Sequence, residues 1–318
     1  MKSLLFDDVD YVHRDHSKDA KTCTHCVWRD FGLNQVCQEF PLAIRRERYH
    51  HVISVPTIQH DFLGFFIVRA GRGLRLTNSH PHSLARGDVF LMAPEVAHSW
   101  NASIDLTVDA IYFQENLWTT REWEILNQLP FLAGLMNPSE KDLIAREHTD
   151  HVGHLSPELH SRVEQTLSEM RRELKTGNLP QHLSARARFF SLLVQMAEWR
   201  AEKIFATRPA RGAAISEVLT FCENNFASDI SNRQLAELMH FSEAHFRNVF
   251  IREVGITPGA YLRQLRLQHA QELLKDPRIP VGDIARLCGY SDSTQLGRVI
   301  KKAFGISPLQ LRRIKANS

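Results

Sequence analysis

Two stretches near the C-terminus share one pattern of hydrophobic and polar positions. Residues 230–263 and residues 279–313 align at an offset of 49 residues, which becomes 50 after one insertion. The matched positions are Leu235 with Ile284, Ala236 with Ala285, Leu238 with Leu287, Phe241 with Tyr290, and Pro258 with Pro308. Internal repeats usually mean that one supersecondary unit is built twice. The pattern therefore predicts two copies of one helical unit.

The first copy predicts a helix-turn-helix over residues 231–254. Ser231 and Ser242 are suited to begin its two helices, because a serine hydroxyl accepts a hydrogen bond from the backbone at a helix start. The inward positions are Leu235, Leu238 and Met239 in the first helix and Phe246, Val249 and Phe250 in the second. The outward row of the second helix is Ala244, Arg247, Asn248 and Ile251. A recognition helix places such a row in the major groove of DNA.

The second copy predicts a helix-turn-helix over residues 280–304, with Pro280 at the first helix start. The inward positions are Ile284, Ala285, Leu287, Cys288, Leu296, Val299, Ile300 and Phe304. The outward row is Ser293, Thr294, Gly297 and Arg298, followed by Lys301 and Lys302. Small hydroxyls and an arginine can reach base edges, whereas neighbouring lysines suit phosphates.

A linker helix is predicted between the two copies, from Thr257-Pro258 to about Lys275. About 18 residues give a rod of roughly 27 Å. Such a rod can hold two recognition helices about one DNA turn, ~34 Å, apart, so one chain can read two successive major grooves of double-stranded DNA. A generic helical repeat explains the inward pattern equally well, but not the caps, turns and basic outer row together.

The pattern changes in residues 45–113 to short runs of β-branched, aromatic and leucine residues. Turn-forming residues punctuate these runs: Gly71, Gly73, Asn78, Pro81, Gly87 and Pro94. This alternation predicts a small antiparallel sandwich or barrel. Small ligands commonly lodge in the interior of such a barrel.

A helical hairpin is predicted after the β-rich part. Ser156 and Pro157 begin its first helix, and Gly177 ends it. The second helix covers residues 182–203, with Ala187, Phe190, Leu193, Val194, Ala197 and Ile204 predicted to face inward. The hairpin either packs on the barrel or presents a face to a second subunit, which would make the protein a homodimer. Residues 206–213 have the composition of a domain linker.

Length and charge support a division into two domains. The 318 residues are enough for two cores. From Ala214 onward there are 14 Lys and Arg against 10 Asp and Glu, a net of +4, which leaves 25 against 26, or −1, for the rest. The positive excess lies with the repeated segment, as in a nucleic-acid-binding domain, although a solvated surface explains four charges equally well.

Composition excludes a membrane protein and indicates reduced thiols. No apolar run approaches the ~20 residues that a membrane span needs, and the N-terminus does not have the pattern of a signal peptide, so we expect a cytoplasmic protein.

Cys23 and Cys26 have a spacing that can bind zinc, and Cys37 can add a ligand. A single such pair is weak support for a metal or thiol sensor, and no resident metal or cofactor is expected.

The last hundred residues resemble a known family. The stretch IPVGDIARLCGYSDSTQLGRVIKKAFGISPLQLRR, together with YLRQLRLQHAQELL, is similar to the C-terminal signature of AraC/XylS-type bacterial transcription regulators. The family usually has an aromatic residue and a serine before the arginine of the second recognition helix, where this chain has Leu296 and Gly297. Glycine lowers helix propensity by ~1 kcal/mol relative to alanine, so this departure weakens the second recognition helix at a base-contact position of the family.

The N-terminal part is similar, more loosely, to the cupin-like effector domain of the sugar-responsive members of that family. The segment from His60 to Trp100 matches their His-Asp-Phe, Gly-Asp and late histidine, and the arrangement is most like the rhamnose-responsive activators. The resemblance implies effector-binding roles for His60, His98 and Trp100. A histidine bonded to a backbone carbonyl explains His60 and His98 equally well. A metal-dependent cupin enzyme needs about three histidines and a carboxylate around one metal, and only His60 and His98 sit where that motif can be matched.

Together these features predict a multidomain α and β protein. We expect an N-terminal segment (1–44), a cupin-like β-barrel with a helical hairpin (45–205), a linker (206–213) and an all-α DNA-binding domain (214–318) with two helix-turn-helix motifs joined by a linker helix. The expected function is transcription regulation, as an activator with a small-molecule effector such as a sugar and with RNA polymerase as a partner. The alternatives are a cupin-type enzyme and a metal- or thiol-sensing regulator.

Overall fold

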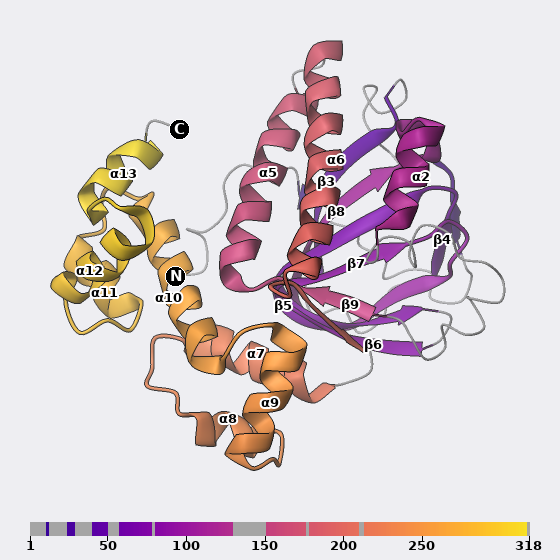
Figure 1. Cartoon of the computed structure of the whole chain (residues 1–318). Helices are drawn as coiled ribbons and strands as arrows, with labels where there is room; N and C mark the ends of the chain where they lie inside the picture. The colour runs from indigo at the N-terminus through magenta and orange to yellow at the C-terminus, as the bar shows by residue number, and fades with distance from the viewer. Residues whose placement is uncertain are drawn as a thin grey trace.

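The computed structural model describes residues 11–12, 24–28, 40–49, 57–77, 80–129, 151–175, 178–209 and 213–316. Figure 1 shows a β-rich N-terminal part, two long helices packed on it, and a C-terminal part made of helices. Within the described residues, no helix is both long and apolar enough to cross a membrane.

One sheet of ten strands organises the described N-terminal residues. The strands are β1 (Tyr11–Val12), β2 (Thr24–Cys26), β3 (Leu42–Tyr49), β4 (Ile58–His60), β5 (Leu63–Thr77), β6 (His80–Ala85), β7 (Asp88–Met92), β8 (His98–Phe113), β9 (His151–His154) and β10 (Ala206–Pro209). The main path runs β1-β3-β8-β5-β7-β9-β10, with β6 on β5 and the β2–β4 pair on β8. Pairing is antiparallel except in β1–β3 and β2–β4.

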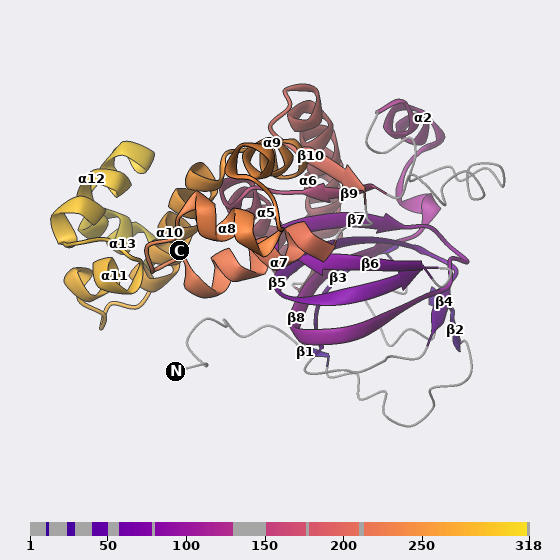
Figure 2. The same cartoon turned by 90° about the horizontal axis from the view of Figure 1, so that it is seen from below.

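The two longest strands, β5 and β8, curve the sheet. Their pairing shifts in register after Val68, Ala70 and Arg72, and such irregularities increase the twist and bend of a strand. The first half of β5 therefore pairs with β7, and its second half pairs with β6. Figure 2 shows the curvature of the sheet, in which β8 lies between β3 and β5. The antiparallel β domain that the sequence predicts is confirmed.

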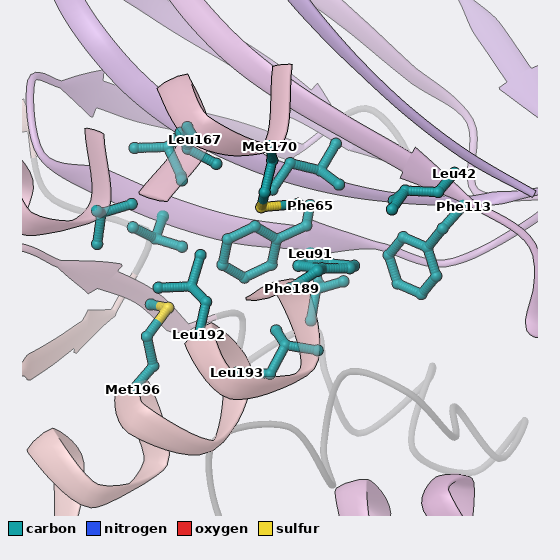
Figure 3. Packing of buried hydrophobic residues seen from close by; sticks show 14 of the residues in the cluster. Leu42, Phe65, Leu91, Phe113, Leu167, Met170, Phe189, Leu192, Leu193 and Met196 are labelled. Carbon is teal, nitrogen blue, oxygen red and sulfur yellow. The ribbon is translucent and has the colours of Figure 1, made fainter. Parts of the chain in front are cut away.

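Alternation along the strands separates two apolar layers. Phe65 and Ile67 point to the helical side, whereas Phe66 and Val68 point to the interior of the curved sheet. Helices α5 (Pro157–Lys175) and α6 (Leu179–Ala201) cover the first layer. Figure 3 shows this layer, where the rings of Phe113 and Phe189 meet edge to face with centroids 5.1 Å apart.

Local chemistry sets the ends of the helical hairpin. The Ser156 hydroxyl accepts a 3.4 Å hydrogen bond from the Leu159 amide, as predicted for the start of α5. Helix α6 begins before residue 182, because the Asn178 side chain accepts from the Gln181 amide and caps it. A short 3-10 helix, η2 (Glu115–Leu117), and helix α2 (Thr120–Gln128) follow β8.

The predicted inward face of α6 is confirmed at Leu193 and Ala197 and wrong at the other predicted positions. The buried residues are His182, Ala185, Phe189, Leu192, Leu193, Met196, Ala197 and Trp199. Ala187 is exposed, Phe190 and Val194 are only partly buried, and Ile204 lies beyond the helix with 40% of its surface exposed. The helical period alone allowed either face, and packing against the sheet selected the one that carries Phe189 and Met196.

The sheet extends beyond the domain limits expected from sequence. Strand β3 begins at Leu42, and β1 and β2, which lie in the first 44 residues, pair with β3 and β4. Residues 206–209 of the expected linker form β10, which pairs antiparallel with β9.

The C-terminal domain contains the repeated unit. Its helices are α7 (Ala213–Asn225), α8 (Asn232–Leu238), α9 (Glu243–Val254), α10 (Pro258–Leu274), α11 (Val281–Leu287), α12 (Ser293–Phe304) and α13 (Pro308–Ala316). Ser231 forms a capping box with Gln234 at α8, and Ser242 caps α9 through the His245 amide, as predicted. Each unit has its own buried core.

Equivalent turns join the helices of the two units. His240 and Gly289 occupy the same repeat position, and both have positive φ, 53° and 74°. A side chain at Gly289 would place its Cβ 2.5 Å from the backbone oxygen of Ala227, so glycine is required there.

Three predicted inward positions are wrong. Leu238, Leu287 and Phe304 are 39%, 47% and 38% exposed. Helices α8 and α11 each end at the leucine, so the residues that follow, Met239 and Cys288, take the buried place. Phe304 is the last residue of α12, and the chain turns away at Gly305 with a φ of 76°.

Candidate nucleic-acid interface and effector site

The outward row of α9 is accessible to a partner. Ala244, Arg247 and Asn248 are exposed, and Ile251 has 36% of its surface exposed. The opposite face of α9 is buried through Phe246 and Phe250. The helix therefore displays the predicted recognition positions on a face that its own core does not use.

Helix α12 displays its outward row in the same way. Ser293, Thr294, Arg298, Lys301 and Lys302 are exposed, and Gly297 is half-buried. The two lysines lie in the last helical turn, where the helix dipole favours positive charge.

Asp292 begins α12, although it was not predicted as a cap. Its carboxylate accepts a 2.8 Å hydrogen bond from the Gln295 amide. This bond, with one from the Ser291 hydroxyl, holds the pKa of Asp292 below its usual range. Ser291 was expected in the turn, and an aspartate two residues after the Gly-Tyr pair is the local signal that identifies the true cap.

The linker helix α10 connects both cores. Tyr261, Leu262 and Leu265 are buried in the first core, whereas Ala270 and Leu274 are buried in the second. Its 17 residues span roughly 26 Å at about 1.5 Å per residue. One continuous helix thus joins the two units, as the sequence predicts.

The structure brings His60, His98 and Trp100 to the interior side of the sheet. All three are buried, and the rings of His60 and His98 lie 5.1 Å apart between centroids. Ile58 in β4 pairs with His98 at the start of β8, which explains why the two histidines meet. Trp100 packs against the ring of Tyr49 at 5.3 Å.

Both histidines are bonded to nearby backbone carbonyls. His60 Nδ1 lies 2.5 Å from the carbonyl oxygen of Phe62, and His98 Nδ1 lies 3.2 Å from that of Val96. Burial lowers the pKa of His60 to about 4, so its ring is neutral at physiological pH. His60 can therefore take part in hydrogen bonds, but does not supply a positive charge.

Glu47 is a polar residue of the interior that was not predicted. It is buried, and its two carboxylate oxygens accept hydrogen bonds of 2.6 and 2.7 Å from the hydroxyls of Tyr49 and Tyr112. Arg75 is also buried, and its guanidinium lies 4.2 Å from the centre of the Phe90 ring. A signal for Glu47 was present in the sequence. Alternate residues of a strand face the same side, so Glu47 lies on the same face of β3 as the aromatic residue Tyr49, and a charged residue on that face indicates a polar site.

Of the three N-terminal cysteines, the structure describes only the backbone of one. The backbone of Cys26 lies in β2, whereas Cys23, Cys37 and the side chain of Cys26 lie outside the described residues. Among the residues that the structure describes, no group of three or more His, Cys, Asp or Glu side chains could hold a metal ion.

Two domain families match the chain. An AraC-like ligand binding domain matches residues 41–193, and a helix-turn-helix domain matches residues 235–314. Over 265 residues the chain is 30% identical to the HTH-type transcriptional activator RhaR of Pectobacterium carotovorum subsp. carotovorum (strain PC1), a match covering 81% of this chain and 86% of that protein. The chain belongs to the AraC family of transcription regulators. The domain matches confirm the predicted fold class, a cupin-like β domain followed by a helical DNA-binding domain.

Other relatives of this AraC-family chain agree. The HTH-type transcriptional activator RhaS of Escherichia coli (strain SMS-3-5 / SECEC) is 25% identical over 260 residues, which covers 81% of this chain and 87% of that protein. The expected resemblance to the rhamnose-responsive activators is thereby confirmed. The protein is a DNA-binding transcription activator with a ligand-binding domain, and not a cupin-type enzyme.

Solved structures are similar to about a third of this chain. An AraC-type regulator from Chromobacterium violaceum is 24% identical with a TM-score of 0.31, covering 33% of this chain and 93% of that chain. The DNA-binding domain of AdpA, in complex with a target DNA, is 24% identical with a TM-score of 0.30, covering 32% of this chain and 91% of that chain.

Proposed function

We propose that α9 and α12 read operator DNA, each with its outward row. The observation that carries this proposal is that both rows are exposed while the opposite helix faces are buried in two separate cores. Arginine and asparagine can form paired hydrogen bonds with guanine and adenine edges in the major groove. The base-reading side chains are therefore Arg247 and Asn248 in the first unit and Arg298 in the second.

The two units contribute unequally in this proposal. Helix α9 presents Ala244, Arg247 and Asn248 without a glycine in its row. Helix α12 has Gly297 beside Arg298, and Lys301 and Lys302 continue its row. The first unit is the stricter base reader, and the second adds phosphate contacts with a looser sequence preference.

The effector is a small molecule that binds on the interior side of the curved sheet, in the region of His60, His98 and Trp100. A sugar fits the chemistry of this region, because its ring faces stack on aromatic side chains and its hydroxyls donate to carboxylates and ring nitrogens. Glu47 is the strongest acceptor there, with two tyrosine hydroxyls already directed at it. Binding acts on transcription only if the ligand has different affinities for two arrangements of the protein.

Further partners follow from activation. We expect RNA polymerase to contact the DNA-bound protein, in the cytoplasm where its DNA lies. We also expect a homodimer through α6, because Leu179, Leu183 and Ala187 recur every four residues and are exposed.

The test measures operator binding by the full chain in the presence of sugars. A duplex selected from a random library is titrated by fluorescence anisotropy, with L-rhamnose and a panel of other monosaccharides added in turn. We expect affinity to fall steeply with salt, and one sugar to change the Kd at least about fivefold. Glu47→Gln should abolish the sugar response, and Glu95→Gln, at an exposed carboxylate, should keep it.

Distinct failures separate the parts of this proposal. A Kd that does not depend on salt would exclude DNA reading by the basic rows. Tight binding that no sugar alters would remove the sugar assignment and leave DNA reading intact. Regulation that disappears when Cys23, Cys26 and Cys37 are all changed to serine would favour the thiol or metal sensor instead.

A further inference from the structure

The turn between β6 and β7 belongs to both domains at once. Leu84, just before the turn, and Phe90, just after it, are buried in the interior layer of the sheet, where the effector is proposed to bind. Ala85, next to Leu84, is buried in the core of the first helix-turn-helix unit, together with Val218 and Leu219 of α7. A single short segment thus reaches two hydrophobic cores.

A partly buried ion pair connects this turn to α7. Arg86 Nη1 lies 2.8 Å from a carboxylate oxygen of Glu223, and both side chains are less than a fifth exposed. Burial alone would lower the pKa of Arg86, but Glu223 beside it raises that pKa above its ordinary value. The Tyr261 hydroxyl of α10 donates a 3.4 Å hydrogen bond to the same carboxylate. Removing either charge would leave the other uncompensated in a buried site.

The turn is held rigidly on the effector-domain side. Asp88 is fully buried and accepts hydrogen bonds from the Ala85 amide at 2.8 Å and from His154 at 2.9 Å. Gly87 has a φ of 89°, and a Cβ there would lie 2.6 Å from the backbone oxygen of Leu155. Because the turn cannot bend freely, a displacement of β6 or β7 moves Arg86 with it.

A second set of contacts joins α5 to α10. The side-chain nitrogen of Gln264 lies 3.3 Å from a carboxylate oxygen of Glu158, and the side-chain nitrogen of Gln268 lies 3.4 Å from His160 Nδ1. These two contacts join the linker helix to the first turn of α5.

This interface involves the first unit and leaves its DNA-reading row uncovered. The end of α9 approaches β10, where a Cβ on Gly255 would be 3.5 Å from that of Ala206, whereas Arg247 and Asn248 stay exposed. Among the described residues, the core of the second unit is formed by the C-terminal domain alone. Docking therefore orients the first unit without masking it.

We propose that the β6–β7 turn, through the Arg86–Glu223 pair, transmits the state of the effector site to the first helix-turn-helix unit. The proposal rests on the proposed effector site on the interior side of the sheet. A ligand that shifts Leu84 and Phe90 moves the turn, and the turn changes the orientation of α9 relative to α12. By thermodynamic linkage, DNA binding changes effector affinity by the same factor.

The first experiment needs no effector. Arg86→Glu places two carboxylates together, and combining it with Glu223→Arg restores an ion pair in the opposite sense. We expect Arg86→Glu to change the Kd for the selected operator at least about fivefold, and the double variant to return it to the wild-type value. Arg121→Glu makes the same charge change at an exposed site on α2 and should have no effect.

Hydrogen exchange distinguishes transmission from simple loss of stability. Phe90→Leu perturbs the interior layer, where Phe90 stacks on Phe66 at 5.1 Å. Phe90→Leu alone should alter the rate of amide hydrogen exchange in α7. The same substitution in a chain that also carries Arg86→Ala should not alter it. The proposal is overturned if Arg86→Glu leaves operator affinity unchanged, or if the Phe90→Leu effect on α7 persists without Arg86. Neither readout involves a sugar, so failure of the effector assignment is recognised separately, by the sugar titration.

Discussion

The exposed side chains of α12 differ in how they can contact DNA. Arg298 lies beside Ser293 and Thr294 on the outward row, whereas Lys301 lies in the last turn. Arg298→Ala should lose about 1 to 3 kcal/mol on the selected operator and relax its sequence preference. Lys301→Ala should weaken binding to operator and random duplexes alike and lower the salt slope by about one. Anisotropy titrations on both duplexes measure this, and equal losses on them for Arg298→Ala would contradict its base-reading role.

The two ring nitrogens of His60 have different surroundings. The sequence left open whether it contacts a ligand or a backbone carbonyl, and the structure shows the carbonyl bond to Phe62. Its Nε2 has no hydrogen-bond partner among the described residues. The carbonyl bond fixes the ring orientation, so an effector contact in our proposal would use Nε2 of a neutral ring.

Helix α12 contains a glycine that nothing nearby requires. No heavy atom lies within 4 Å of the place where a Cβ on Gly297 would be. Gly297→Ala should therefore stabilise the helix by about 1 kcal/mol. If this glycine loosens DNA reading, the substitution should also increase the ratio of operator to random affinity.

A matched control lies in the preceding helix. Gly282 in α11 also has open space at its Cβ position, so Gly282→Ala adds helix propensity to the same unit outside the recognition helix. Thermal unfolding should show a gain for both variants, and only Gly297→Ala should sharpen discrimination. A stabilised Gly297→Ala with unchanged discrimination would show that flexibility of α12 does not set the preference.

Helix α6 has exposed apolar side chains that do not pack on the sheet. Leu179 and Leu183 are 63% and 49% exposed. We expect the 36.6 kDa chain to sediment as a dimer and Leu183→Glu to sediment as a monomer, because a charge in an apolar helix seam disrupts pairing. Gln195→Glu, on a neighbouring exposed row, is the control. A wild-type monomer at micromolar concentration would remove this interface.

The helix-turn-helix units could be predicted from sequence because their determinants are local. Caps such as Ser231 and Ser242, and inward positions such as Phe246 and Phe250, act over three or four residues along the chain. The same locality predicted the linker helix and the outward rows. Errors came at helix ends, as at Leu238, where the length of the helix decides which residue is buried.

Only the tertiary structure decided the contacts between residues far apart in sequence. Glu47 meets the hydroxyl of Tyr112, 65 positions later, because β3 and β8 pair in a particular register. Arg86 meets Glu223, 137 positions later, because the helical domain docks on the β6–β7 turn. Strand register and docking depend on the packing of many residues together, and no short stretch of sequence encodes them. The sequence alone thus determined two helix-turn-helix units and a β-rich domain, and the tertiary structure determined how they are joined.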